Sequence, residues 1–226
     1  KPDIGTLLIE GLVQRQAERK TRNETFPTPF RQLNRCFNSG TGHDKGNIIV
    51  VLAPEKSFKT GFFINLIKGY LKKKKRVLFI DLENGQNSLA IRFEQSMANE
   101  NKADVLSGKA DEKLRKIFRK YKRIGAEVDI KRFPAYSTTV MDIENYTTKQ
   151  RREHGIIYDL AVIDYPSLMA DLSGSKEDNS RIQNVYMELK NLAERMDWDV
   201  IWGAAHVTRE GRKRLPYKYE PNDTAK

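Results

Sequence analysis

Short, almost wholly apolar runs alternate along this chain with longer segments in which apolar residues recur every three or four positions. The short runs are typical of parallel strands buried on both faces: 47–53 (NIIVVLA), 76–82 (RVLFIDL), 158–165 (YDLAVIDY) and 198–205 (WDVIWGAA). The charged, periodic segments predict helices from residue 60 onward and over 88–98, 112–125, 141–155 and 180–196. This alternation predicts an α/β fold in which outer helices flank a mostly parallel sheet.

A separate amphipathic helix is predicted near the beginning of the chain, over residues 4–20. Its apolar residues fall at helical spacing, and they are Ile4, Leu7, Leu8, Leu12 and Val13. The segment TRNETFPTPF that follows contains two prolines and interrupts any regular element. We therefore expect a helix within 1–25 that stands apart from a main domain over 26–226. Its apolar face packs either on its own domain or on a neighbouring subunit.

The chain is strongly basic, with a formal net charge of +11 over 226 residues and an isoelectric point near 9.6. Such a charge favours a polyanionic partner, with nucleic acid as the first candidate and an anionic membrane surface as the second. Cys36 is the sole cysteine, so an internal disulfide is excluded and an intracellular protein is expected. No run approaches the roughly 18 apolar residues of a spanning helix. Because Lys1 stands in place of an initiator methionine, we expect a piece of a longer protein.

Candidate chemistry begins at the end of the first predicted strand, in the stretch APEKSFKT at 53–60. A phosphate-binding loop wraps phosphate oxygens with backbone N–H groups and ends in a lysine for the β/γ-phosphates and a Ser or Thr for Mg²⁺. Lys59 and Thr60 match that ending. Phe58 stands where such a loop normally has glycine, and a residue with a side chain is strained there if φ is positive. The stretch therefore predicts a nucleotide site with one unusual residue.

Polar residues also stand at the ends of the other three predicted strands: Glu83 just after the second, Asp164 at the end of the third and His206 just after the fourth. Ligands bind at the carboxyl ends of strands in an open parallel sheet, so we expect these groups to meet, with the strand before Glu83 near the strand before the phosphate loop. Lys59 then neutralises phosphate charge, Thr60 holds Mg²⁺, Asp164 holds a water bound to that ion, and Glu83 orients the attacking water. The simpler alternatives are a helix N-cap or surface residue for Glu83 and a structural strand-end histidine for His206.

In its motifs the chain resembles the DnaB-type hexameric replicative helicases of bacteria and phages, which have a RecA-like ATPase core. The start of the phosphate loop, Ala53 and Pro54, looks like that of the family, and LAVIDYPSLM is similar to its Walker-B segment. DLENGQNSLAIR resembles the second strand motif, and AHVTREGRKRLP resembles the sensor strand and the basic segment after it. The resemblance covers most of the chain. The two departures are Phe58 in the loop and His206 where the family usually has glutamine.

The resemblance implies a role for each residue of these motifs. It implies nucleotide contacts from the phosphate loop and two further residues, namely Ala53, Pro54, Glu55, Lys56, Ser57, Phe58, Lys59, Thr60, Arg92 and Asp164. Catalysis is assigned to Glu83, Lys59 and His206, and Mg²⁺ ligation to Thr60 and Asp164. Nucleic-acid contacts are assigned to Arg209, Arg212, Lys213 and Arg214, for which the alternative is a solvated or subunit-facing basic loop.

As a whole, the resemblance implies an ATP- and Mg²⁺-dependent replicative DNA helicase that translocates on single-stranded DNA as a hexameric ring, in the cytoplasm of a bacterium or a phage-infected cell. The helix over 4–20 then corresponds to a linker helix that docks on the adjacent subunit. A neighbour's arginine finger is expected C-terminal to the sensor segment, and a primase or a helicase loader is a further expected partner. One alternative is a degenerate P-loop protein that binds DNA or a replication partner with little ATPase activity. The other, a RecA-type recombinase, matches LAVIDYPSLM less well.

Overall fold

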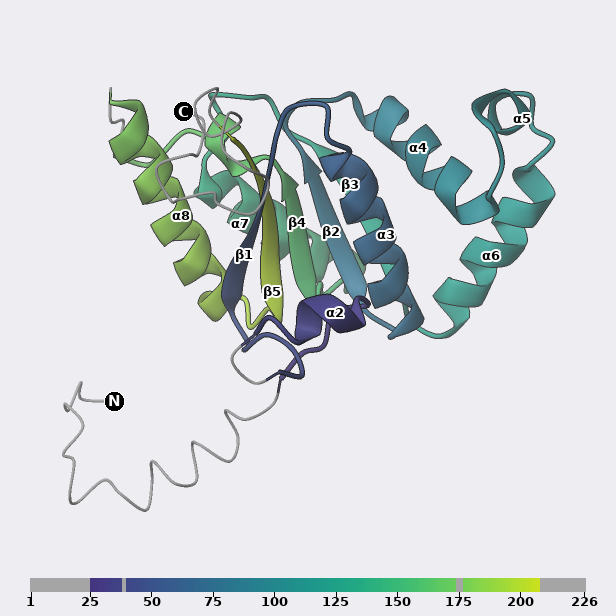
Figure 1. Cartoon of the computed structure of the whole chain (residues 1–226), viewed down its shortest axis with the longest axis horizontal. Coiled ribbons are helices and arrows are strands. Elements are labelled where there is room, and N and C mark those ends of the chain that lie inside the picture. The colour runs from purple at the N-terminus through teal and green to yellow at the C-terminus, as the bar shows by residue number, and fades with distance from the viewer. Residues whose placement is uncertain (1–24, 38–39, 174–176, 208–226) are drawn as a thin grey trace, which may run out of the picture. The chain divides into compact units, whose positions relative to one another are not determined.

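A computed structural model of the chain describes residues 25–37, 40–173 and 177–207 (Figure 1). The contacts divide the chain into two compact units, Lys1–Lys45 and Gly46–Lys226. In the described part of the first unit, Phe26 forms an antiparallel bridge with His43, and a short helix α2 (Arg31–Asn34) lies between them in the chain. The predicted helix over 4–20 lies outside the described residues, and the division at residue 25 stays a prediction.

The described part of the second unit contains a parallel five-stranded sheet flanked by helices, which confirms the predicted fold class (Figure 1). The strands are β1 (Asn47–Ala53), β2 (Arg76–Asp81), β3 (Glu127–Arg132), β4 (Leu160–Asp164) and β5 (Val200–His206). The helices are α3 (Lys59–Lys72), α4 (Gln86–Ala98), α5 (Lys102–Leu106), α6 (Asp111–Arg123), α7 (Val140–His154), the 3₁₀ helix η1 (Pro166–Leu168) and α8 (Asp178–Arg195). All four predicted strands and the five predicted helices of this unit are present.

The order of the strands corrects one expectation about the site. From the sequence we expect β2 near β1, whereas the order β1-β5-β4-β2-β3 inserts β5 and β4 between them. A crossover helix can return the chain to any place in a parallel sheet, and chain order does not specify which place. As a result β2 pairs with β4, in a register that sets Asp81 opposite Asp164.

Strand β3, which reads EVDIKR, was not predicted from the sequence. Charged residues alternate with Val128 and Ile130, and among the described strands β3 pairs only with β2. An edge strand of this kind lacks the continuous apolar run of the central strands. The half-buried Asp129 accepts hydrogen bonds from the hydroxyl groups of Tyr146 (2.6 Å) and Tyr158, which offsets the loss of its hydration.

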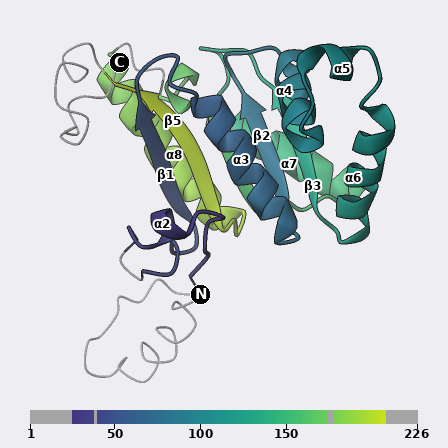
Figure 2. The same ribbon diagram turned by 45° about the vertical axis from the view of Figure 1, so that its right-hand side comes forward.

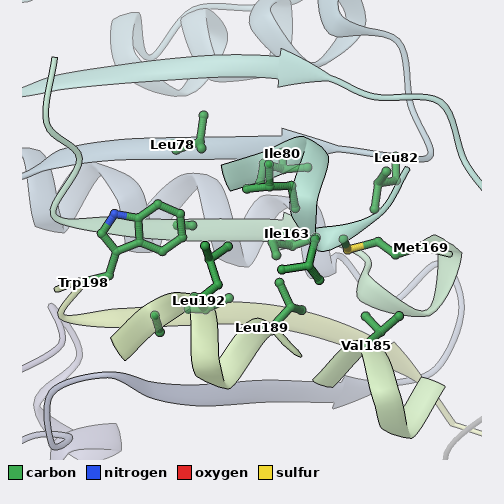
Figure 3. Close-up of a cluster of buried hydrophobic side chains, with 14 of the residues drawn as sticks. Leu78, Ile80, Leu82, Ile163, Met169, Val185, Leu189, Leu192 and Trp198 are labelled. Carbon is green, nitrogen blue, oxygen red and sulfur yellow. The ribbon is translucent and has the colours of Figure 1, made fainter. Parts of the chain in front are cut away.

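Different helices cover the two faces of the sheet, because alternate residues of each strand point to opposite faces. On one face Leu78 and Ile80 of β2 pack in a buried cluster with Leu189 of α8 and with residues of α7 (Figure 3). On the other face Phe63 of α3 meets Phe79 of β2, with the ring centroids 6.4 Å apart. Figure 2 shows α3 in front of the sheet, with α7 and α8 behind it. The strand ends that carry the candidate residues are thereby fixed by two packed layers.

Helices α4, α5 and α6 lie together beside the sheet (Figure 1), and a smaller apolar cluster joins them. Its buried members are Ala98, Val105, Ala110 and Leu114. Helix α4 also packs against α3 and β3, so its position relative to the candidate site is set by the sheet. None of the helices in the described ranges is long and apolar enough to cross a membrane.

Candidate nucleotide-binding site

The predicted site residues converge at the carboxyl ends of β1, β2, β4 and β5, around a cavity of about 740 Å³. Most of the predicted residues line it: Glu55, Lys56, Ser57, Phe58, Lys59, Thr60, Glu83, Arg92, Asp164 and His206. Ala53 and Pro54 are not among the lining residues, but their carbonyl oxygens bind Lys59. The four basic residues predicted to contact nucleic acid lie outside the described residues. The structure thus gathers residues that are far apart in sequence into one polar cavity.

Two residues of the phosphate loop have a left-handed backbone although neither is glycine. Phe58 has φ 66° and ψ 27°, and Lys56 has φ 61°. The conformation of Phe58 is the one that glycine adopts readily, and it is strained for a residue with a Cβ atom. Phe58 is the N-cap residue of α3, and the first three residues of this helix line the cavity. The N–H groups of a first helical turn have no intrahelical acceptor, so this end of α3 suits an anion.

Lys59 links the phosphate loop to the end of β5. Its buried side chain donates from Nζ to the carbonyl oxygens of Pro54 (2.9 Å) and Ala53 (3.3 Å) and to Nδ1 of His206 (2.9 Å). An ammonium group can only donate, so Nδ1 of His206 is the acceptor and the neutral ring carries its proton on Nε2. Lys59 and His206 are therefore in direct contact, as the prediction of a shared site requires.

Thr60 and Asp164 form the second link, between α3 and the end of β4. The Thr60 hydroxyl donates to Oδ2 of Asp164 over 2.7 Å. Burial raises the pKa of Asp164 to about 6, the negative charges of Glu83 and Asp81 add to the increase, and the hydrogen bond from Thr60 opposes it. A bound cation would favour the ionised carboxylate in this position.

The chemistry of this pair fits Mg²⁺, which prefers oxygen ligands and is held in nucleotide sites by one or two protein groups together with waters and phosphates. Thr60 and Asp164 are the residues that would hold it. Within the described ranges, no group of three or more His, Cys, Asp and Glu side chains could form a metal cage on its own.

Asp81 is a buried carboxylate to which the sequence analysis assigned no role. Its Oδ1 accepts the backbone N–H of Asn84 over 2.9 Å, whereas the buried Oδ2 has no hydrogen-bond partner among the described atoms. A buried oxygen of this kind calls for a water or an ion. The signal was present in the sequence, because Asp81 closes the apolar run VLFI in the way that Asp164 closes LAVI. Asp81 adds negative charge beside the proposed cation ligands.

Glu83 lies just beyond β2, and its exposed side chain borders the same cavity. The negative charge of Glu83 acts on the neighbouring Tyr165. Burial is the largest cause that raises the pKa of Tyr165 to about 12, and the charge of Glu83 is the second. The Tyr165 ring in turn lies edge-on to the imidazole of His206, with the centroids 4.6 Å apart. Glu83 is thus a solvent-facing carboxylate close to Asp164, in a site whose imidazole is oriented by contacts with Lys59 and Tyr165.

Two helices also contribute to the lining of the cavity. Arg92, Gln95 and Ser96 belong to α4, and Ile64 and Asn65 belong to α3. Of these five residues the sequence predicted only Arg92. Polar residues are common on the outer helices of an α/β fold, so nothing in the sequence marks the other polar ones as facing a site.

Comparison with known proteins decides the family. A family model described as the DnaB-like helicase C-terminal domain matches residues 25–218. The chain belongs to this family. Among the curated relatives of this DnaB-like domain is the replicative DNA helicase DnaB of Helicobacter pylori, which is 28% identical in strain ATCC 700392 / 26695 and 26% identical in strain J99 / ATCC 700824. Both alignments run over 186 residues and cover 78% of this chain and 35% of the relative, so the chain spans about a third of the length of these relatives.

Two solved structures share the fold. The ATPase domain of G40P superposes with a TM-score of 0.73 at 18% identity, covering 97% of this chain and 78% of that one. A DnaB-like replicative helicase, solved in a study of its interactions with primase, gives a TM-score of 0.71 at 19% identity, covering 98% of this chain and 53% of that one. The likeness shows a RecA-like ATPase fold, as the sequence motifs predicted.

Proposed function

We propose that this DnaB-like domain is the motor of an ATP-dependent replicative DNA helicase that translocates on single-stranded DNA as a hexameric ring. One observation carries the proposal: Lys59, Thr60, Glu83, Asp164 and His206, which come from four strand ends, border one cavity at the end of the phosphate loop. Any one of these groups is common at a strand end, whereas the complete set matches what nucleoside triphosphate hydrolysis requires.

In the proposed mechanism, Lys59 and the first turn of α3 bind the β- and γ-phosphates. Thr60 and Asp164 would hold Mg²⁺, which would supply positive charge to the phosphate oxygens when bound. Glu83 accepts a hydrogen bond from the attacking water and orients it toward the γ-phosphorus. His206, with its proton on Nε2, is placed to donate to a phosphate oxygen or to that water.

The assembly and the partners are part of the same proposal. Ring formation would let the apolar face of residues 4–20 dock on a neighbouring subunit, and the basic residues 209–214 would contact DNA phosphates. Primase is proposed as a further partner, because a solved DnaB-like structure of the same fold was described with its interactions with primase. The setting that suits such a motor is the cytoplasm of a bacterium or a phage-infected cell.

A second function is a degenerate P-loop protein that binds DNA or a replication partner and hydrolyses little ATP. The observation in its favour is Phe58, a strained and bulky residue at the glycine position of the phosphate loop. The intact set of catalytic groups favours the motor, because a protein without hydrolysis has no need to keep all of them in one cavity.

Glu83→Gln tests the motor directly, because it removes the negative charge of Glu83 while keeping its shape. We expect ATP affinity to stay within about twofold and hydrolysis to fall roughly a hundredfold or more, as for a lost general base. Binding would be measured by calorimetry and turnover by phosphate release, with and without single-stranded DNA. Glu112→Gln, an exposed carboxylate on α6 outside the cavity, is the matched control and should change neither value. A parent protein that binds ATP but shows no DNA-stimulated turnover in any assembled form would favour the degenerate protein.

A further inference from the structure

Phe58 is unusually placed for an aromatic residue. Its side chain is 77% exposed, more than any other large apolar side chain that the structure describes. It also has a left-handed backbone, which a residue with a Cβ adopts only under strain. Burial of the ring in the protein core therefore does not explain why this residue occupies the glycine position of the loop.

The Phe58 ring lies directly on the first turn of α3, against Gly61. A Cβ atom built on Gly61 would lie less than 3.0 Å from three carbon atoms of that ring, closer than real contacts allow. Glycine is otherwise a poor residue inside a helix. A side chain at position 61 would displace the exposed ring from this place, so the position of the ring depends on Gly61.

The ring and Gly61 both border the cavity that contains the catalytic groups. Lys59 marks the end of this cavity where phosphates would bind, and Ile64 continues the apolar wall along α3. Asn65 of α3 and Gln95 of α4 supply polar groups elsewhere in the same lining. Phe58, Gly61 and Ile64 are thus the apolar members of a lining that is otherwise polar. A small organic ligand usually packs on apolar groups while polar groups fix its orientation.

We propose that the Phe58 ring packs on the nucleoside part of bound ATP, and that Gly61 is required because it leaves space for the ring in that position. The inference rests on the proposed nucleotide site and adds to it a residue that determines affinity for the nucleoside as distinct from the phosphates. An aromatic face suits this role because every nucleobase has a π-face on which a ring can stack.

Phe58→Ala and Phe58→Trp in the full chain test the role of the ring. Alanine keeps the requirement for a left-handed backbone and removes the ring, so a loss cannot be attributed to altered strain. We expect Phe58→Ala to weaken ATP binding about tenfold, in the range of a lost base–aromatic contact, and to leave binding of inorganic tripolyphosphate unchanged. Phe58→Trp should retain ATP affinity. Leu106→Ala, which truncates a 61% exposed side chain on α5, is the control and should change neither ligand.

Gly61→Ala tests the dependence between the two positions in a double-mutant cycle with Phe58→Ala. The added methyl group should weaken ATP binding where the ring is present and have a smaller effect where the ring has been removed, so the two effects should not add. Independent effects would show that Gly61 does not serve the ring.

Unchanged or tighter ATP binding in Phe58→Ala would overturn the proposal. If that variant instead loses oligomer in sedimentation at unchanged ATP affinity, the ring contacts a neighbouring subunit and the proposal is equally wrong. The proposed nucleotide site has a separate test in Lys59→Ala, which should abolish binding of both ATP and tripolyphosphate. If Lys59→Ala loses binding of both ligands while Phe58→Ala binds ATP as the parent does, the proposed function stands and only the role of the Phe58 ring is wrong.

Discussion

Asp164 ends the apolar strand β4 with a carboxylate that the fold removes almost completely from solvent. Its pKa is raised because burial makes the ionised carboxylate unfavourable when no cation is bound. Such a group destabilises the folded chain in its ionised form and gains most from a bound dication. The same property that makes Asp164 unfavourable for stability makes it favourable as a ligand.

The pH dependence of stability should reflect this group. The pKa of Asp164 is about 6 in the folded chain, above its ordinary value of 3.8, so the folded state binds the proton more tightly. The stabilising contribution is complete below about pH 4 and is lost as the pH rises through 6. We expect Asp164→Asn, which keeps an acceptor for Thr60, to exceed the parent in free energy of unfolding by up to about 3 kcal/mol at pH 7.5 without Mg²⁺, and to match it near pH 4.

Chemical denaturation at a series of pH values measures this difference. Glu112→Gln is again a suitable control, because its carboxylate is exposed on α6. A gap between Asp164→Asn and the parent that does not change with pH would contradict the assignment of the ionisation to Asp164.

Strand β3 shows how one element is held in place by polar contacts. Its Asp129 accepts hydrogen bonds from Tyr146 of α7 and from Tyr158, which precedes β4. Burial is the first cause of the raised pKa of both tyrosines, and their bonds to Asp129 add to it, so both hydroxyl groups remain donors. These contacts tie the edge of the sheet to the layer of helices behind it.

Asp129→Ala should therefore destabilise the chain by about 2 kcal/mol, because the hydroxyl groups of the buried Tyr158 and the half-buried Tyr146 lose their acceptor. Glu127→Ala, an exposed position on the same strand, should change the free energy of unfolding by less than about 0.5 kcal/mol. Urea unfolding at pH 7 would compare the two. Equal effects would mean that the strand is held by its ladder with β2 alone.

At the scale of the whole molecule, the net charge of +11 favours a polyanion but does not say which surface meets it. Two groups of basic residues are candidates for contact with the polyanion. One follows β5 and was predicted from the sequence: Arg209, Arg212, Lys213 and Arg214. The other lies on the exposed side of α6: Arg115, Arg119, Lys120 and Lys122.

Replacing each set of four by alanine changes the net charge equally, so the two variants control for each other. If residues 209–214 contact DNA phosphates, neutralising them should lower the slope of log affinity for single-stranded DNA against log salt by about 3, the value for four lost contacts. The variant on α6 should keep the slope of the parent. Fluorescence anisotropy of a labelled oligonucleotide at several salt concentrations measures both, and the reverse result would place the DNA on α6.

The sequence by itself determined the layers of the fold and predicted the type of site. The central strands were predicted because strands buried on both faces are continuously apolar, and the helices because their apolar residues recur at helical spacing. The phosphate loop was predicted because its residues are contiguous in the chain. The edge strand β3 was missed because its charged residues interrupt the apolar signal.

Only the tertiary structure decided which distant residues meet. The insertion of β5 and β4 between β1 and β2 brings His206 to Lys59, 147 positions away, and sets Asp81 opposite Asp164. The contact of the Phe58 ring with Gly61 depends on the path of the chain into α3. Local propensities set the elements, but crossover connections and side-chain packing depend on long-range contacts, which no local pattern in one sequence records.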